Sequence, residues 1–284
     1  MILSYHPCFE ADKNLLCAGR EPDADDLAAI KAAHAVILPQ GCYRSLYEMA
    51  HNNCRHVFPN LDSKFKYAGK IGQVRLFQME NMPHPRTETY LNIDAFSGHY
   101  GGFPAKPAFD FPFVFKFDWG GEGYQVYLIQ SASEFKNILQ TAGEYEDSGH
   151  TGFIIQEYIP SNNRSLRVVV IGQTVISYWR VQNNARNFCS NLTRGAVIDS
   201  HTDPDLQALA VTWVKAFCSR TGINLAGFDL LFSSEIKNRT PLFLEINYYF
   251  GRRGLGGSER FYEILIAEIE KWIDSIGLKS DRNS

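Results

Sequence analysis

Short apolar runs alternate with amphipathic stretches over the first 60 residues, and this pattern predicts a small parallel α/β sheet. The runs ILSYH, NLLCAG, AVILPQ and HVFPN are expected to be strands, because they are short and apolar. DADDLAAIKAAHA and YRSLYEMAHNN lie between them and are expected to be helices. Strands that alternate with helices are typical of a parallel sheet.

The middle of the chain has a different pattern. A helix is predicted from about Ser63 to Asn81, because the prolines of MPHPRT cannot continue it. Residues 95–109 are rich in Gly, Phe and Pro and are expected to form a loop. FPFVFKF and VYLI are expected to be strands on either side of the glycine-rich turn WGGEGYQ. The helix SASEFKNILQTA should follow, with Ser131 as its N-cap.

The last part is predicted to be an α+β lobe. FIIQEYI, LRVVVIG and QTVISYWRV are expected to be consecutive strands, and the Gly-Gln turn makes the last two antiparallel. A helix from about Pro204 to Thr221, the strands AGFDLLF and PLFLEIN, and a helix from about Ser258 to Ile276 complete it. The predicted division of the chain is 1–62, 63–155 and 156–284.

Composition narrows the class of protein. Of the 284 residues, 45% are hydrophobic, and the net charge of −3 gives no basic excess of the kind that nucleic-acid binding requires. No apolar run is long enough for a membrane helix, and the N-terminus does not resemble a signal peptide, so a cytoplasmic protein without a membrane partner is expected. The six cysteines form no CxxC pair and are expected to be buried free thiols.

The run LFLEIN places polar side chains inside an apolar strand. Alternate residues of a strand point to one face, so Glu245 and Asn247 are expected on one side, with Leu244 and Ile246 on the other. Asp229 interrupts the apolar run AGFDLLF in the same way. A buried carboxylate must be paired or bind metal. If the two strands are neighbours, these three side chains converge as oxygen ligands suited to Mg²⁺; the alternative is that the acids sit at strand ends in water.

Three further stretches are candidates for binding. In VFKFDWGGEGYQV, the glycines can let backbone amides approach phosphates, and Lys116 favours this over an ordinary flexible hairpin. In IIQEYIP, the polar end of the strand is either a solvent-facing edge or a hinge whose backbone and Glu157 bind a purine. The stretch RVQNNARNFCSNLTRGA holds basic residues that are either solvated or stabilise a phosphoryl group in transfer.

The order of these parts resembles the ATP-grasp superfamily. A lysine on a helix is followed by PHPRT, a strand with lysine and a glycine loop, QEYI, LRVVVIG, SNLTRG, GFDLL and LEIN. The resemblance runs from about Asp62 to the last helix. It is most similar to the ribosomal-protein glutamate ligases and related glutathione synthetase-like carboxylate–amine ligases. The fold implied is an α/β N-terminal domain followed by an α+β ATP-grasp fold whose two lobes clamp ATP.

The resemblance assigns roles to particular residues, with ATP and Mg²⁺, two ions expected, as cofactors. The residues implied in ATP binding are Lys70, Lys116, Gly120, Gly121, Gly123, Gln156, Glu157, Tyr158, Ile159 and Ser165. The implied metal ligands are Asp229, Glu245 and Asn247, and the positions near the reacting phosphate are Arg180, Asn191 and Arg194.

Two departures from the family pattern affect the site. Where relatives often hold the ribose with an acid, this chain has Ser165, and Ser165 or Asn163 is expected to replace that contact. Where relatives continue with small residues and a proline, this chain reads YYFGRRG. Arg252 and Arg253 are therefore candidates for binding the acid substrate; the alternative is that one arginine is solvated and the other pairs with Glu259.

The predicted activity is a Mg²⁺-dependent ATP ligase that joins a small-molecule or peptide carboxylate to an amine through an acyl-phosphate. The alternatives are an ATP-grasp kinase that phosphorylates a small molecule, and a nucleotide-binding protein without ligase activity. The sequence names neither the acid nor the amine, and it leaves homo-oligomerisation open.

Overall fold

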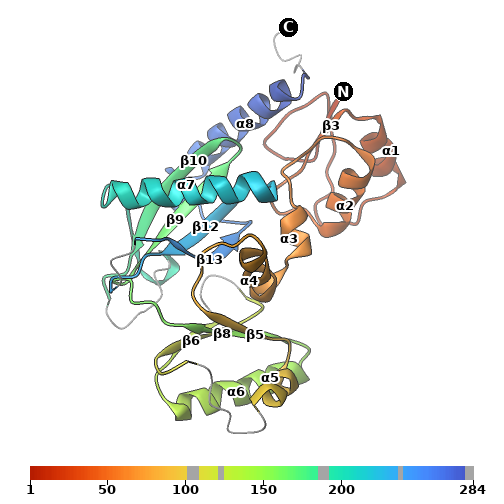
Figure 1. Cartoon of the computed structure of the whole chain (residues 1–284). Coiled ribbons are helices and arrows are strands. Elements are labelled where there is room, and N and C mark those ends of the chain that lie inside the picture. The colour runs from red at the N-terminus through yellow and green to blue at the C-terminus, as the bar shows by residue number, and fades with distance from the viewer. Residues whose placement is uncertain (101–108, 121–124, 185–191, 236–238, 279–284) are drawn as a thin grey trace.

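The computed structural model describes residues 1–100, 109–120, 125–184, 192–235 and 239–278. It contains three sheets, which Figure 1 shows as an N-terminal domain, a small lobe and a large sheet between long helices. Within this part of the chain, no helix combines the length and the apolar character that crossing a membrane requires.

The N-terminal domain has the predicted parallel sheet, in the order β2-β1-β3-β4. Its elements are β1 Ile2–Ser4, β2 Lys13–Asn14, α1 Ala24–Ala32, β3 Ala35–Ile37, α2 Arg44–Asn53 and β4 Val57–Phe58. Helix α1 begins at a capping box in which Asp23 and Asp26 exchange side-chain bonds with each other's backbone N–H. The run NLLCAG, predicted as a strand, contributes only its first residue to β2.

The small lobe is an antiparallel sheet in the order β5-β8-β6-β7, covered on one side by two helices (Figure 1). Its elements are β5 Thr87–Tyr90, α5 Ile93–Tyr100, β6 Phe113–Phe117, β7 Val126–Ile129, α6 Ala132–Asp147 and β8 Phe153–Glu157. Ser131 accepts from the Glu134 N–H and caps α6 as predicted. The predicted boundary after residue 155 falls inside β8, which belongs wholly to this sheet; the domain boundaries otherwise stay a prediction.

Two predictions for the middle of the chain were wrong. The single helix expected from Ser63 to Asn81 is two helices, α3 Asp62–Lys66 and α4 Gly69–Met79. The break has a local cause, since Gly69 takes a φ of +70° and the Asp118 side chain accepts from the Ile71 N–H at 2.7 Å, so that a new helix begins.

The first residues of the loop expected over 95–109 belong instead to helix α5, which extends to Tyr100. Asn92 accepts from the Ala95 N–H at 2.7 Å, which is an N-cap interaction, and the Phe96 side chain is buried. Residues 101–108 lie outside the described part. The edge strand β5, which precedes this helix, was not predicted at all.

The large sheet is antiparallel in the order β11-β10-β9-β12-β13, and the predicted β9–β10 hairpin is confirmed. Its strands are β9 Arg164–Ile171, β10 Thr174–Val181, β11 Val197–Asp199, β12 Leu225–Leu231 and β13 Leu242–Asn247. The remaining elements are the 3-10 turns η1 Leu192–Arg194 and η2 Arg253–Leu255 and the helices α7 Pro204–Thr221 and α8 Ser258–Ser275. Strands β12 and β13 are therefore neighbours, as the argument about LFLEIN required.

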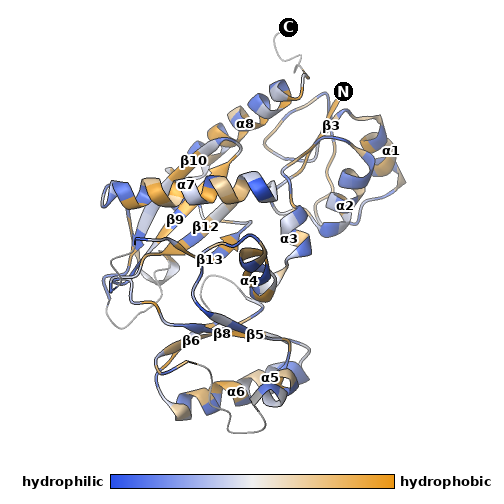
Figure 2. Cartoon of the chain, viewed as in Figure 1, coloured by the Kyte–Doolittle hydropathy of each residue, from blue (hydrophilic) through white to orange (hydrophobic). Residues whose placement is uncertain are grey.

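Both faces of the large sheet are buried, because α7 covers one face and α8 the other. Along β9, Val168 and Val170 pack in the core under α7, whereas Val169 and Ile171 pack in the core under α8. This two-sided burial explains why LRVVVIG is apolar throughout. The α7, α8 and α6 ribbons carry both apolar and polar residues, as expected for helices with one buried side (Figure 2).

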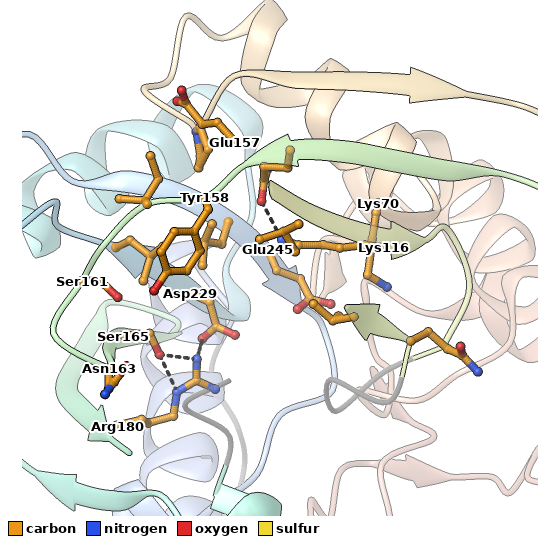
Figure 3. A pocket seen from close by; sticks show the side chains of 18 of the residues that line it. Lys70, Lys116, Glu157, Tyr158, Ser161, Asn163, Ser165, Arg180, Asp229 and Glu245 are labelled. Carbon is orange, nitrogen blue, oxygen red and sulfur yellow. Dashed lines mark hydrogen bonds and ion pairs between the residues drawn. The ribbon is translucent and has the colours of Figure 1, made fainter. Parts of the chain in front are cut away.

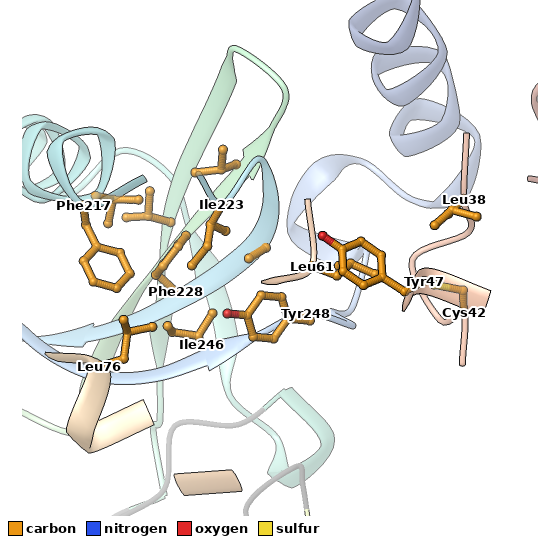
Figure 4. Packing of buried hydrophobic residues seen from close by; sticks show 14 of the residues in the cluster. Leu38, Cys42, Tyr47, Leu61, Leu76, Phe217, Ile223, Phe228, Ile246 and Tyr248 are labelled. Atoms are coloured by element: carbon orange, nitrogen blue, oxygen red, sulfur yellow. The ribbon is translucent and has the colours of Figure 1, made fainter. Parts of the chain in front are cut away.

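The core under α7 continues into the N-terminal domain. Figure 4 shows it running from Phe217 and Phe228 through Ile246 and Tyr248 to Leu61 and the first sheet. Phe243 lies at its centre, with ring centroids 5.6 Å from those of both Phe77 and Phe217. This residue therefore joins β13 to α4 and α7.

We predict that Phe243→Ala lowers the free energy of unfolding by about 3–5 kcal/mol, because it leaves a cavity among aromatic rings. Phe111→Ala is the control, since Phe111 is 41% exposed, and it should cost far less. Urea denaturation followed by circular dichroism measures both. Equal losses for the two variants would contradict the central place of Phe243 in the core.

Candidate active site

A cleft opens between the small lobe and the large sheet. Figure 3 shows its side chains coming from both parts of the molecule. The lining residues are Lys70, Pro85, Val114, Lys116, Gly120, Gln125, Val126, Gln156, Glu157, Tyr158, Ile159, Ser161, Asn163, Ser165, Arg180, Asp229, Leu231, Leu244 and Glu245. Predicted site residues that are far apart in the sequence therefore share one cavity.

The two predicted lysines approach this cleft from different elements. Lys70, near the start of α4, donates from Nζ to the Gly120 carbonyl at 3.2 Å. Lys116, on β6, donates from Nζ to Gln156 Oε1 at 2.7 Å. The Gln156 amide in turn donates to Thr87 Oγ1 at 2.8 Å. Each lysine thus donates to a neutral oxygen at the wall of the cleft, and an anionic ligand could replace these two contacts.

The predicted hinge follows β8 and lines the cleft. The Glu157 carboxylate accepts from the Arg86 backbone N–H at 2.8 Å and from Arg86 Nε at 3.0 Å. Its side chain is therefore engaged with the segment before β5, and Tyr158 and Ile159 follow it along the cleft wall. Apolar side chains complete this part of the cleft: Val114, Val126, Leu231 and Leu244.

The centre of the site is an ion-pair cluster on Asp229, and we name these four residues the Asp229 cluster: Asp229, Arg167, Arg180 and Ser165. Arg167 on β9 binds both carboxylate oxygens, through Nε to Oδ1 and through Nη2 to Oδ2 at 3.0 Å. Arg180 on β10 contacts Oδ1 at 2.8 Å and also donates to Ser165 Oγ at 2.8 Å. Asp229, Arg167 and Arg180 are each buried.

Strand register explains this convergence. Asp229 is the cross-strand partner of Arg167 on β9 and of Glu245 on β13, so the three lie side by side on one face. The face is the one that α8 covers further along, because the intervening Phe228 and Leu230 pack under α7. The predicted convergence of Asp229, Glu245 and Asn247 is confirmed as a matter of position.

The electrostatics of the cluster keep Asp229 ionised. Burial alone would raise the pKa of this carboxyl, but the positive charges and hydrogen bonds of Arg167 and Arg180 outweigh burial and hold the pKa below its usual value. Two arginines on one carboxylate leave the buried cluster with a net positive charge. It therefore provides a cationic surface at the end of the cleft.

Glu245 and Asn247 extend from the cluster. Asn247 donates from Nδ2 to Asp229 Oδ2 at 3.2 Å, which leaves its amide oxygen directed elsewhere. Within the described residues, the Glu245 carboxylate has no hydrogen bond or ion pair, although its negative charge favours the charged form of the nearby Arg167. The prediction for Leu244 was wrong: a bulge between Asp229 and Leu230 shifts the register of β13, so Leu244 lies in the cleft beside Glu245.

The predicted magnesium ligands fit a metal only in part. Both oxygens of Asp229 already accept hydrogen bonds, so Glu245 and the Asn247 amide oxygen are the ligands best able to reach a cation. Among the described residues, no three Asp, Glu, His or Cys side chains form a metal-binding group. The donor set therefore suits Mg²⁺ that takes most of its ligands from phosphates and water, as Mg²⁺ commonly does.

A second cavity adjoins the cleft. It is lined by Arg167, Tyr178, Arg180, Leu192, Thr193, Asp229, Glu245, Asn247, Tyr249, Phe250, Gly251, Arg252 and Arg253. Arg180, Asp229 and Glu245 line both cavities. The two cavities therefore meet at the Asp229 cluster.

Arg252 and Arg253 differ in their surroundings. The Arg252 guanidinium lies 4.5 Å from the Phe261 ring centroid and 4.4 Å from that of Tyr262, and it donates to Ser258 Oγ at 3.4 Å. The Arg253 side chain is exposed and, within the described residues, its guanidinium has no hydrogen bond or ion pair. The alternative pairing with Glu259 is not found in this part of the chain. Arg252 is thus a fixed cation, whereas Arg253 is available to a ligand.

Several predicted residues are placed differently or lie beyond the description. Gly121, Gly123 and Asn191 fall outside the described residues. The backbone of Arg194 ends the turn η1, but its side chain is not described. Ser165, the predicted ribose contact, accepts from Arg180 and so belongs to the Asp229 cluster.

Sequence reasoning missed several residues of the site. Arg167 is not among the predicted site residues, although a charge inside the apolar run LRVVVIG is the same signal that identified Asp229. The other missed residues are Pro85, Val114, Gln125, Val126, Ser161, Leu231 and Leu244 in the cleft, and Tyr178, Leu192, Thr193, Tyr249, Phe250 and Gly251 in the second cavity. The apolar ones gave no distinctive signal, because they follow the ordinary pattern of strands.

Comparison with known proteins agrees with this fold. The profile of the RimK-like ATP-grasp domain matches residues 98–276, and the chain belongs to this family. A probable alpha-L-glutamate ligase 1 of Shewanella sp. (strain MR-4) is 29% identical over 175 residues, which cover 61% of this chain and 53% of that protein. A probable alpha-L-glutamate ligase of Aeromonas salmonicida is 29% identical over 51% of this chain and 45% of its own. The chain spans about half the length of these relatives.

Solved structures show the same fold at low sequence identity. A RimK domain ATP-grasp protein from Sphaerobacter thermophilus has a TM-score of 0.63 at 14% identity, covering 94% of this chain and 98% of that one. D-alanine–D-alanine ligase from Bacillus anthracis, solved with ATP, has a TM-score of 0.59 at 13% identity, covering 95% of this chain and 90% of that one. The predicted ATP-grasp fold is confirmed.

We predict that Asp229→Asn lowers the free energy of unfolding by about 3–5 kcal/mol at pH 7, because it leaves two buried guanidiniums without a counter-charge. The exposed Asp274→Asn is the matched control and should change it little.

The pH dependence follows from the direction of the pKa shift. A depressed pKa in the folded state means that the contribution of Asp229 is fully present above the unfolded pKa of about 3.9 and is lost as pH falls through the folded pKa. Urea denaturation should therefore show a constant difference between the parent protein and Asp229→Asn from pH 7 to about 5, narrowing only below about 4. A difference that narrowed already between pH 7 and 5 would contradict this ionisation state.

Proposed function

We propose that this protein is an ATP-dependent ligase that joins a carboxylate to an amine through an acyl-phosphate. The observation that carries the proposal is the meeting of two cavities at Arg180, Asp229 and Glu245. One cavity has an apolar end and two lysines, which suits a nucleotide. The other has cationic walls, which suits an acid. A phosphoryl group at their junction would lie within reach of both ligands.

The lining residues favour one orientation of a nucleotide in the cleft. Its base would lie among Val114, Val126 and Leu231, with the hinge backbone at Tyr158 and Ile159 beside its edge. Its phosphates would then reach Lys70 and Lys116, which would exchange the Gly120 and Gln156 oxygens for charged ones. Asn163 and Ser161 line the side of the cleft where the ribose would lie.

The first chemical step is phosphoryl transfer to the acid. A carboxylate oxygen attacks the γ-phosphorus, the bond to the β-phosphate oxygen breaks, and ADP leaves with the electron pair. The positively charged Asp229 cluster faces the developing charge, and positioning and charge neutralisation are what such a reaction needs from a protein. Glu245 and Asn247 would hold Mg²⁺, which supplies charge neutralisation at the phosphate oxygens when bound. Asn191 and Arg194 are proposed to contact the same phosphate.

The second step forms the amide. The amine nitrogen attacks the acyl carbon, the carbon–oxygen bond to phosphate breaks, and inorganic phosphate leaves while the amine loses a proton. No covalent bond to the protein is required. The acid would be held in the second cavity, where Arg253 is available to a further anionic group. The relatives named as probable alpha-L-glutamate ligases support a ligase of this kind, but the acid and the amine of this protein stay open.

Product analysis tests the proposal. The purified protein is incubated with Mg²⁺, ATP and pooled amino acids, dicarboxylic acids and amines, and products are identified by mass spectrometry. A ligase gives ADP, free phosphate and a product with the mass of acid plus amine less one water. A phosphorylated product without free phosphate would indicate a kinase, and ATP binding without ADP formation in any pool would indicate a binding protein; either result contradicts the proposal.

We predict that Glu245→Gln lowers ADP formation by about 100-fold or more and changes the melting temperature little, because it removes a carboxylate that lies at the junction without a side-chain hydrogen bond or ion pair. Glu259→Gln, at an exposed position that is not among the residues lining either cavity, is the matched control. Steady-state kinetics across a Mg²⁺ titration measure the effect. Equal rates and equal Mg²⁺ dependence for the two variants would remove Glu245 from the site.

Substitution of the two arginines is expected to have different effects. Arg253→Ala should raise the Michaelis constant for the acid found in the product assay by about 10-fold or more, because an available guanidinium would lose its carboxylate partner, while the constant for ATP stays unchanged. Arg252→Ala should mainly lower stability, since Arg252 packs over Phe261 and Tyr262. The exposed Arg260→Ala is the control. A defect of Arg253→Ala confined to ATP would place the acid elsewhere.

A further inference from the structure

A side-chain amide completes the edge of the large sheet beside the proposed metal ligands. Gln73 of α4 donates from Nε2 to the Ile246 carbonyl at 2.9 Å, and its Oε1 accepts from the Ile246 N–H at 2.8 Å. Strand β13 is the last strand of the sheet, so its outward backbone groups have no further strand to pair with. The Gln73 amide thus takes the place of a neighbouring strand, using both of its hydrogen-bonding groups on one residue.

The residue that Gln73 holds lies between the two proposed ligands. Ile246 is flanked by Glu245 and Asn247, and its own side chain is buried in the core under α7. The side chain and both backbone groups of Ile246 are therefore fixed. This fixes the directions in which Glu245 and Asn247 leave the strand, because their side chains project to the opposite face.

The same helix carries one of the proposed phosphate-binding lysines. Lys70 and Gln73 are three residues apart on α4 and so lie on neighbouring positions of one helix face. Lys70 reaches the Gly120 carbonyl of the small lobe, and the Ile71 N–H is bound by Asp118 of the same lobe. Helix α4 therefore connects the small lobe to β13 through Gln73 at a fixed spacing.

We propose that Gln73 is a positioning residue that sets Glu245 and Asn247 at the correct place relative to Lys70 and the bound nucleotide. It touches neither the nucleotide nor the metal in this role. Instead, it holds the backbone that carries the ligands. Loss of a group that orients metal ligands commonly lowers metal affinity by about 10- to 100-fold. The inference rests on the proposed Mg²⁺–ATP site.

The test compares Gln73→Glu with Gln78→Glu. Gln78 lies on the exposed side of the same helix, so both variants make the same chemical change and add the same charge. The change at Gln73 removes the Nε2 donor and places a carboxylate oxygen against the Ile246 carbonyl. Isothermal titration calorimetry with the non-hydrolysable analogue AMP-PNP, in EDTA and then in Mg²⁺, measures how much the metal increases nucleotide affinity.

We expect Gln73→Glu to bind AMP-PNP in EDTA as tightly as the parent protein does. The increase in AMP-PNP affinity on adding Mg²⁺ should be about tenfold smaller than in the parent protein. Gln78→Glu should keep both. An unchanged Mg²⁺ gain in folded Gln73→Glu would overturn the proposal. So would unfolding of both Gln73→Glu and the isosteric Gln73→Met by circular dichroism, because Gln73 would then be required for the fold itself. If the parent protein itself shows no Mg²⁺ gain, the proposed Mg²⁺–ATP site fails first, and the proposal for Gln73 fails with it.

Discussion

One buried carboxylate connects four adjacent strands of the large sheet. Asp229 on β12 is bound by Arg167 on β9 and Arg180 on β10, and it accepts from Asn247 on β13. A buried charge of this kind is stable only when fully paired, so the strands must keep the register that brings the partners together. The same register places Glu245 beside the cluster. The geometry of the whole site therefore depends on this one set of ion pairs.

The Asp229 cluster also lies at the boundary between the two cavities. Arg180 and Asp229 form part of the wall of each, and Glu245 lies where they meet. A phosphoryl group that moves from a nucleotide to an acid needs both partners on either side of one fixed, positively charged point. In this protein, side chains of β10 and β12 form that positively charged point. Helix α4 supplies the connection to the small lobe, through Lys70 on one side and Gln73 on the other.

Much of this arrangement could be predicted from the sequence, because charges inside apolar strands are costly and therefore informative. Asp229 and Glu245 were recognised on that ground, and their strands are neighbours. The bulge that brings Leu244 into the cleft could not be predicted, since it depends on pairing with β12 and not on any residue of LFLEIN. The break before α4 likewise depends on Asp118, which is distant in sequence. The arginines on Asp229 could not be predicted either, because only the strand register shows that they converge, and the role of Asp229 as a metal ligand stays a prediction.

The central claim is that a nucleotide phosphate lies where the two cavities meet. A crystal structure of the protein with Mg²⁺ and AMP-PNP tests this most directly. The account predicts the base beside Tyr158 and Ile159, the phosphates at Lys70 and Lys116, and the terminal phosphate next to Glu245 and the Asp229 cluster. A nucleotide bound elsewhere, or one whose terminal phosphate points away from the second cavity, would contradict it.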